Sequence, residues 1–223
     1  MMLRLAVLIS GRGSNLQALI DYISQADVPA HIEAVLADNP AKGLDYAAAA
    51  NIRTIAINKT DFENKAAFEQ ALARQIDQLN IDMICLAGFM SVLSAAFCQR
   101  YHGKIINIHP SLLPEYKGLH THERAIADQA KQHGCSVHIV TPEIDGGAVL
   151  EQKTVPVYAD DTANMLAARV LQAEHIIYPM VVGALATGLL TFDITDDFIT
   201  PIFTSGILPG IIGDERNMPW PSE

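Results

Sequence analysis

The 223-residue chain has few cysteines and few basic residues. Its three cysteines are widely spaced and form no C-x-x-C pair, which argues against a disulfide framework and a cysteine-built zinc site and favours a reducing, cytoplasmic setting. Fifteen Lys and Arg stand against 25 Asp and Glu, a formal charge of −10. A general nucleic-acid or anionic-membrane surface is therefore not expected. An acidic chain can still bind a small anion through backbone N–H groups.

Long hydrophobic runs are also missing. No stretch reaches the roughly 18 uninterrupted apolar residues of a membrane span. The apolar stretch at the N-terminus stops at Ser10-Gly11-Arg12-Gly13, too early for a signal peptide with its cleavage site. We therefore interpret residues 3–9 as a buried first strand.

What the sequence has is an alternation of short apolar runs and helical periodicity. It predicts an α/β fold: a doubly wound, mostly parallel sheet covered on both faces, followed by an antiparallel hairpin and a long helix. The predicted strands are Leu3–Ile9, His31–Ala37, Ile52–Ile57, Ile81–Leu86, Lys104–Ile108, Cys135–Thr141 and Ala148–Val157. The predicted helices are Asn15–Ala26, Ala41–Ala50, a helix from an Asp61 N-cap to Leu79, Leu93–Arg100 and Thr162–Leu185.

The C-terminal end has a different character from the rest. The last thirty or so residues hold four of the eleven prolines and show no clear period. We predict a single catalytic domain over residues 1–190 and an irregular tail over residues 191–223.

The first strand ends in a candidate anion site. Ligands of open α/β sheets bind beyond the carboxyl ends of the strands. The sequence from Gly11 to Asn15 reads G-R-G-S-N, and its two glycines allow a tight turn that aims backbone N–H groups and a helix N-terminus at a phosphate. A dinucleotide site, with Asp38 as its ribose-binding acid, is the alternative, although Leu16 replaces the expected third glycine. A plain strand–helix turn is the third interpretation.

The strand ending near residue 108 carries the strongest chemical signal. Asn107 and His109 are two residues apart on an extended segment, so their side chains point to the same side. An amide donor and an imidazole can together stabilise an oxyanion and move a proton. Asp145, in an Asp-Gly-Gly turn, would favour the imidazolium if it lay close to His109. A strand-end histidine that is only hydrogen-bonded remains the alternative.

The histidines are concentrated in one region. Six of the eight fall between residues 102 and 138, so a zinc hydrolase is conceivable. Its candidate ligands are His109, His120, His122 and His138, with Asp145. No H-E-x-x-H or similar spacing supports it, and the prediction is that no metal is bound.

Several motifs taken together resemble one enzyme family. They are N-x-H-P-S-L-L-P from Asn107, G-R-G-S-N from Gly11, Leu86-Ala87-Gly88-Phe89-Met90, Gly118-Leu119-His120-Thr121-His122, Asp145-Gly146-Gly147 and Glu174-His175-Ile176-Ile177-Tyr178-Pro179. Over residues 3–190 the chain resembles the folate-dependent phosphoribosylglycinamide formyltransferases. The resemblance implies a formyltransferase-like Rossmann variant. It implies transfer of a formyl group from 10-formyltetrahydrofolate to the amine of 5-phosphoribosyl-glycinamide, in de novo purine biosynthesis, without a metal.

The resemblance also implies roles for individual residues. Asn107, His109 and Asp145 match the catalytic trio. The matches to the ribonucleotide site are Gly13, Ser14, Asn15 and Glu174. The matches to the folate site are Lys65, Met90, Ser91, Val92, Leu93, Asn107, Thr141, Pro142, Glu143, Ile144 and Asp145. One departure is Ser91, where bacterial relatives often have arginine.

Other activities are weighed against the predicted one from features of the sequence. Methionyl-tRNA formyltransferase shares the chemistry but resembles a longer chain with a basic C-terminal domain, whereas residues 187–223 hold six acids and one base. Formyltetrahydrofolate hydrolase usually carries an extra N-terminal domain. A nicotinamide-dependent oxidoreductase leaves Asn107, His109 and Asp145 unexplained. The expected partners are small-molecule substrates, with no nucleic acid and no membrane; a homodimer is left open.

Overall fold

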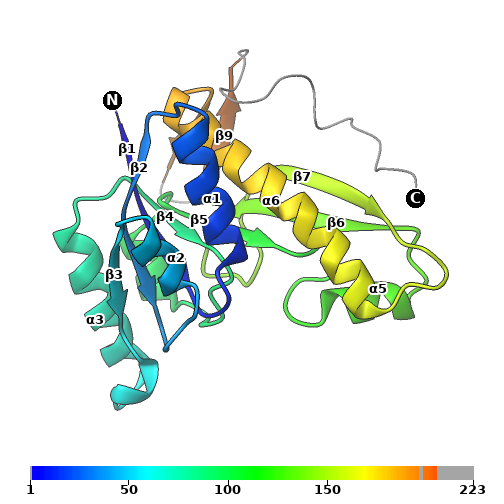
Figure 1. Cartoon of the computed structure of the whole chain (residues 1–223), viewed down its shortest axis with the longest axis horizontal. Coiled ribbons are helices and arrows are strands. Elements are labelled where there is room, and N and C mark those ends of the chain that lie inside the picture. The colour runs from blue at the N-terminus through cyan, green and yellow to red at the C-terminus, as the bar shows by residue number, and fades with distance from the viewer. Residues whose placement is uncertain (1, 196–197, 205–223) are drawn as a thin grey trace.

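The structure, a computed structural model, describes residues 2–195 and 198–204 and is organised around one mixed sheet (Figure 1). Its seven strands lie in the order β3-β2-β1-β4-β5-β6-β7. The first five are mutually parallel, and β6 and β7 pair antiparallel. The predicted doubly wound, mostly parallel sheet is therefore confirmed. The strands are β1 (Leu3–Ile9), β2 (Ala30–Ala37), β3 (Arg53–Ala56), β4 (Met83–Leu86), β5 (Ile105–His109), β6 (Gln132–Ile139) and β7 (Val149–Pro156).

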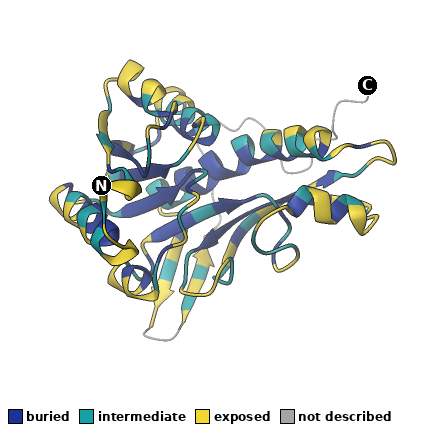
Figure 2. Cartoon of the chain, turned by 90° about the horizontal axis from the view of Figure 1, so that it is seen from below, coloured by how far each residue is buried: buried dark blue, intermediate teal, exposed yellow. Residues whose placement is uncertain are grey.

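Side-chain alternation divides the core into two layers, one on each face of the sheet. Leu5, Val7 and Ile9 of β1 belong to one buried cluster, whereas Ala6 and Leu8 belong to the other. The first cluster is covered by α1 (Ser14–Gln25), α2 (Leu44–Ala49), α5 (Thr121–Ala127) and α6 (Ala163–Thr187). The second is covered by α3 (Lys65–Gln78) and α4 (Ala95–Arg100). Figure 2 shows the buried strands between helices whose outer surfaces are exposed.

The long helix α6 is the main covering element of the first layer. It is long and apolar enough to span a membrane by length and composition, yet 56% of its most apolar window is buried inside the domain. The hydroxyl of its fully buried Tyr178 donates to the carbonyl of Leu86 at 3.0 Å and approaches that of Ile106 at 3.3 Å. Tyr178 therefore joins α6 to β4 and β5 by hydrogen bonding as well as by packing.

Two helix predictions need correction. The N-cap of α3 is Asn64, whose side chain accepts from the Ala67 N–H at 3.0 Å. Asp61 instead ends a 3-10 turn, Lys59–Asp61, because Asn58 caps that turn first. The sequence pattern also missed α5, a seven-residue helix too short to show helical periodicity.

The expected irregular tail is wrong for the described residues that follow α6. Strands β8 (Leu190–Ile194) and β9 (Ile199–Phe203) form an antiparallel hairpin. Phe192 and Ile199 pack against the first core cluster, and Pro201 is tolerated because the two-stranded sheet needs no further N–H donor there. Residues 205–223 lie outside the described part of the chain. The assignment of residues 1–190 to a single catalytic domain stays a prediction.

The Tyr178 contacts predict a measurable stability loss. Tyr178→Phe keeps the ring but removes a buried donor, and it should lower the free energy of unfolding by about 1–3 kcal/mol. Tyr158→Phe is the matched control, because Tyr158 is half exposed and its ring would still lie beneath Arg169. Urea unfolding of the three proteins measures the effect, and equal stabilities would show that the hydroxyl contributes nothing.

Candidate active site

The trio expected from the sequence converges at the carboxyl end of β5. His109, the last residue of this strand, is buried, and its Nδ1 lies 3.5 Å from Asp145 Oδ2. Asp145 is 36 positions further along the chain, in the loop between β6 and β7. Asn107 lies two residues before His109 and contacts His138 of β6, with 3.2 Å between Asn107 Nδ2 and His138 Nε2. The structure therefore brings together an amide, an imidazole and a carboxylate.

Backbone carbonyls determine which nitrogen of each histidine carries a proton. His109 Nε2 lies 3.1 Å from the Tyr116 carbonyl oxygen, which only accepts, so Nε2 is protonated and donates. His138 Nδ1 lies 2.8 Å from the Ile139 carbonyl, so Nδ1 is the donor and Nε2 can accept from Asn107. Burial lowers the pKa of His138 below its ordinary value, which keeps this ring neutral.

Asp145 is held by a neighbouring loop. Its Oδ2 accepts the backbone N–H of Gly118 at 2.8 Å, and its backbone adopts a positive φ of 49°. The next contact between the same two loops is an ion pair, 2.7 Å between Lys117 Nζ and Glu143 Oε1. The 110–118 loop therefore supplies a backbone donor to the same carboxylate oxygen that faces His109.

The predicted phosphate loop has the required geometry. Gly13 caps α1 with a φ of 80°, in the left-handed region that favours glycine. A Cβ at Gly13 would lie 2.6 Å from the Cα of Gly43, so the close approach of these two backbones excludes any larger residue. Gly13, Ser14 and Asn15 thus lie where the loop ends and a helix N-terminus begins, an arrangement that suits an anion.

Asn15 and Glu174 form a buried pair next to this loop. Asn15 Nδ2 donates to Glu174 Oε2 at 2.7 Å, whereas Asn15 Oδ1 is buried and accepts no hydrogen bond from the described residues. Burial raises the pKa of Glu174 to about 7, although the Asn15 donor acts in the opposite direction. A buried amide oxygen and a carboxylate of near-neutral pKa are suited to hydroxyl or amine donors of a ligand.

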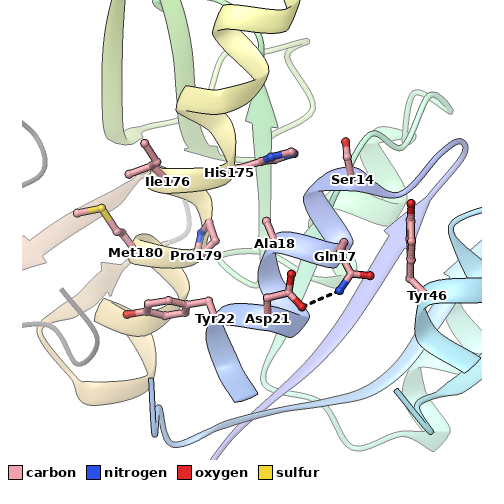
Figure 3. Close-up of a pocket in the computed structure, with 10 residues that line it drawn as sticks. All are labelled: Ser14, Gln17, Ala18, Asp21, Tyr22, Tyr46, His175, Ile176, Pro179 and Met180. Carbon is pink, nitrogen blue, oxygen red and sulfur yellow. Dashed lines mark hydrogen bonds between the residues drawn. The ribbon is translucent and has the colours of Figure 1, made fainter. Parts of the chain in front are cut away.

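A groove of about 460 Å³ extends from the phosphate loop along the surface between α1 and α6 (Figure 3). Ser14 lines one end and Tyr22 and Met180 line the other, and none of the trio lines it. Strands β1 and β5 are separated in the sheet only by β4. The phosphate loop and the trio are therefore about 10 Å apart by strand spacing.

The predicted folate residues divide into two kinds. Met90, Val92 and Ile144 are exposed large apolar side chains, two from the segment that follows β4 and one from the residue next to Asp145. Leu93 is instead buried in the second core cluster. The remaining loop residues, Thr141, Pro142 and Glu143, lie at the surface or partly buried.

Two polar members of the folate set, Lys65 and Ser91, interact with neighbouring acidic side chains. Lys65 Nζ lies 3.9 Å from Glu69, whose carboxylate binds the backbone and hydroxyl of Ser94. Ser91 Oγ donates to Asp38 at 2.5 Å. Lys59 approaches both Asp38 and Ser91, at 3.5 and 3.3 Å.

These contacts weigh against the alternative sites. The Asp38 carboxylate accepts from Ser91 and Asn39 and pairs with Lys59, so it is occupied by protein donors where a dinucleotide would need a free ribose-binding acid. Among the described residues, no group of three or more His, Cys, Asp or Glu side chains converges as metal ligands.

Sequence reasoning missed the groups that orient the trio. His138 is predicted from the sequence only as a candidate zinc ligand, whereas in the structure it is the direct partner of Asn107 on the neighbouring strand. The Tyr116 carbonyl and the Gly118 N–H are backbone groups, so the residue types in the sequence do not indicate these contacts.

Comparison with known proteins agrees with this geometry. The Formyl transferase family model matches residues 3–182. The chain belongs to the formyl transferase family. It is 44% identical over 189 residues to the phosphoribosylglycinamide formyltransferase of Escherichia coli, covering 84% of this chain and 89% of that protein. It is also 44% identical over 186 residues to the human trifunctional purine biosynthetic protein adenosine-3, of which it spans only 18%.

Solved structures of the formyl transferase family show the same fold. The crystal structure of phosphoribosylglycinamide formyltransferase from Brucella melitensis superposes with a TM-score of 0.80 at 47% identity, over 86% of this chain and 99% of that one. Glycinamide ribonucleotide transformylase 1 from Symbiobacterium toebii gives a TM-score of 0.83 at 36% identity, over 89% and 93%. The family match includes every residue of the trio and of the Asn15–Glu174 pair.

Glu174 predicts a pH dependence of stability for this formyl transferase. Its carboxyl holds a proton more tightly in the folded chain, where the pKa is about 7, than in the unfolded chain, where it is near 4.5. This group therefore lowers stability as pH rises from about 4.5, and the loss is complete above about 7, on the order of 3 kcal/mol.

Glu174→Gln should abolish that contribution. We expect urea unfolding between pH 5 and 8 to show a smaller decline for the variant than for the wild type, while exposed Glu63→Gln should decline as the wild type does. Buried histidines such as His133, whose pKa burial lowers to about 4, titrate in all three proteins and cancel in the comparison. Identical declines in wild type and Glu174→Gln would contradict the assignment.

Proposed function

We propose that this chain transfers the formyl group of 10-formyltetrahydrofolate to the amine of 5-phosphoribosyl-glycinamide, giving the formylated ribonucleotide and tetrahydrofolate in de novo purine biosynthesis. The observation that carries the proposal is the convergence of Asn107, His109 and Asp145 at the end of β5. Formyl transfer to an amine passes through a tetrahedral oxyanion and requires a proton to move, and this trio provides for both needs.

Each member of the trio has a role that follows from its contacts. His138 occupies one N–H of the Asn107 amide and thereby fixes its orientation, leaving the second N–H for the developing oxyanion. His109, when protonated, adds positive charge beside the same atom. Asp145, 3.5 Å from His109 Nδ1, stabilises that charge.

The two substrates occupy the two neighbouring regions. Gly13, Ser14 and Asn15 bind the phosphate through backbone N–H groups, and Glu174 with Asn15 binds the sugar or the glycinamide end. The folate covers the exposed apolar side chains of Met90, Val92 and Ile144, with the 141–145 loop against the pterin and Lys65 near the acidic tail. No step requires a metal. The enzyme acts in the cytoplasm on small molecules.

The trio can be tested by formyl-transfer assay with glycinamide ribonucleotide. Asn107→Ala and His109→Ala should each lower kcat by about 10²–10³, the usual cost of removing an oxyanion-stabilising group. Because the two residues act on one atom, the double variant should lose much less than the product of the single losses. His31→Ala, an exposed site at the start of β2, is the control. Full activity in His109→Ala would contradict the mechanism.

The phosphate assignment predicts an effect confined to one substrate. Gly13→Ala places a Cβ against Gly43 at a positive φ, so it should displace the loop and raise KM for the ribonucleotide at least tenfold. KM for the folate should change less than threefold. Gly188→Ala is the matched control, because Gly188 has a φ of 73° at the far end of α6 and open space around it. Equal increases in both KM values would show that this loop does not bind the phosphate.

A further inference from the structure

Two members of the trio, Asn107 and His109, lie in rows of side chains that cross three adjacent strands. In the register of the sheet, His109 of β5 is opposite Ser136 of β6, and Ser136 is opposite Gln152 of β7. Directly paired residues of neighbouring strands project from the same face, so Gln152 lies in the row of His109 although it is on the outermost strand. Gln152 is exposed, and packing gives no reason for its residue type.

Gln152 nevertheless uses both amide hydrogens on buried partners. Its Nε2 donates to Ser136 Oγ at 2.7 Å and to the Leu113 carbonyl at 2.9 Å. Ser136 is completely buried; its hydroxyl donates to the Ser111 carbonyl at 2.6 Å and accepts the Leu113 N–H at 3.0 Å. Leu113 is thus hydrogen-bonded at its N–H, to Ser136, and at its carbonyl, to Gln152. Gln152 also donates to the Ser136 hydroxyl.

These contacts secure the start of the loop that orients the trio. The Ser111 hydroxyl donates to the Glu115 carbonyl at 2.6 Å, which folds the loop back on itself. A few residues later, the Tyr116 carbonyl accepts from His109, and the Gly118 N–H donates to Asp145. The position of both contacts therefore depends on where the 110–115 segment is fixed.

We propose that Gln152 is a positioning residue for formyl transfer, acting through the 110–118 loop to hold His109 and Asp145 in register. The inference rests on the proposed function for its chemistry and on the hydrogen bonds for its geometry. A primary amide suits this position because its one nitrogen donates to a hydroxyl and a carbonyl at once. Glutamate has the same shape but no donor when ionised, and methionine has the same length but no donor at all.

The experiment compares Gln152→Met and Gln152→Glu with Gln132→Met. Gln132 is an exposed glutamine at the start of β6, on the same sheet, and it provides the matched control. We expect both Gln152 variants to lower kcat at least tenfold with KM for the ribonucleotide changed less than threefold, because the Gly13–Asn15 loop is on another part of the sheet. Gln132→Met should retain wild-type values.

Amide hydrogen exchange supplies a readout that does not depend on activity. The N–H groups of Leu113 and Gly118 should exchange at least tenfold faster in Gln152→Met than in wild type, while those of β1 stay unchanged. If the wild type transfers no formyl group, the proposed function fails, but faster exchange would still show that Gln152 fixes the loop. If the wild type is active and Gln152→Met keeps kcat within twofold, the inference is overturned. It is also overturned if kcat and both KM values deteriorate together with a loss of protection throughout the sheet.

Discussion

The antiparallel pairing of β6 with β5 is the constraint on which the candidate active site depends. Five parallel strands alone would leave Asn107 and His109 on an edge strand, with a neighbouring strand, β4, on one side only. The added strand places His138 opposite Asn107 and Ser136 opposite His109. The turn that follows β6 then carries Asp145 back to His109. The β5–β6 pairing therefore supplies His138 as the partner of Asn107 and Ser136 as the hydrogen-bond partner of the 110–118 loop. The turn after β6 supplies the Asp145 carboxylate.

The phosphate loop and the trio lie at the ends of different strands of the same sheet. The phosphate loop follows β1 and is completed by α6, which contributes Glu174 from the first core layer. The net charge of −10 does not oppose phosphate binding there, since the donors are backbone N–H groups made available by a positive φ at Gly13. The trio lies at the end of β5, two strands away from β1 in the sheet.

The sequence alone predicts those features that depend on residues close together in the chain. Alternation of apolar runs predicts the seven strands, and i, i+2 spacing places Asn107 and His109 on one side. The 3.5 Å contact of His109 with Asp145 could not be derived this way, because it depends on the β5–β6 register and on a backbone N–H from Gly118. The β8–β9 hairpin was missed for the opposite reason: Pro201 is locally unfavourable in a strand but harmless in a two-stranded sheet.

The two histidines beside Asp145 differ in which ring nitrogen carries a proton. The carboxylate lies between two imidazoles, with His109 Nδ1 at 3.5 Å and His138 Nε2 at 3.7 Å. His138 donates from Nδ1 to Ile139 and accepts Asn107 at Nε2, so it has no proton for Asp145 while it stays neutral, and burial favours the neutral form. His109 donates from Nε2 to Tyr116, which leaves Nδ1 facing the carboxylate. Of the two rings, His109 therefore presents to the carboxylate the nitrogen that is not used in a hydrogen bond to another described residue.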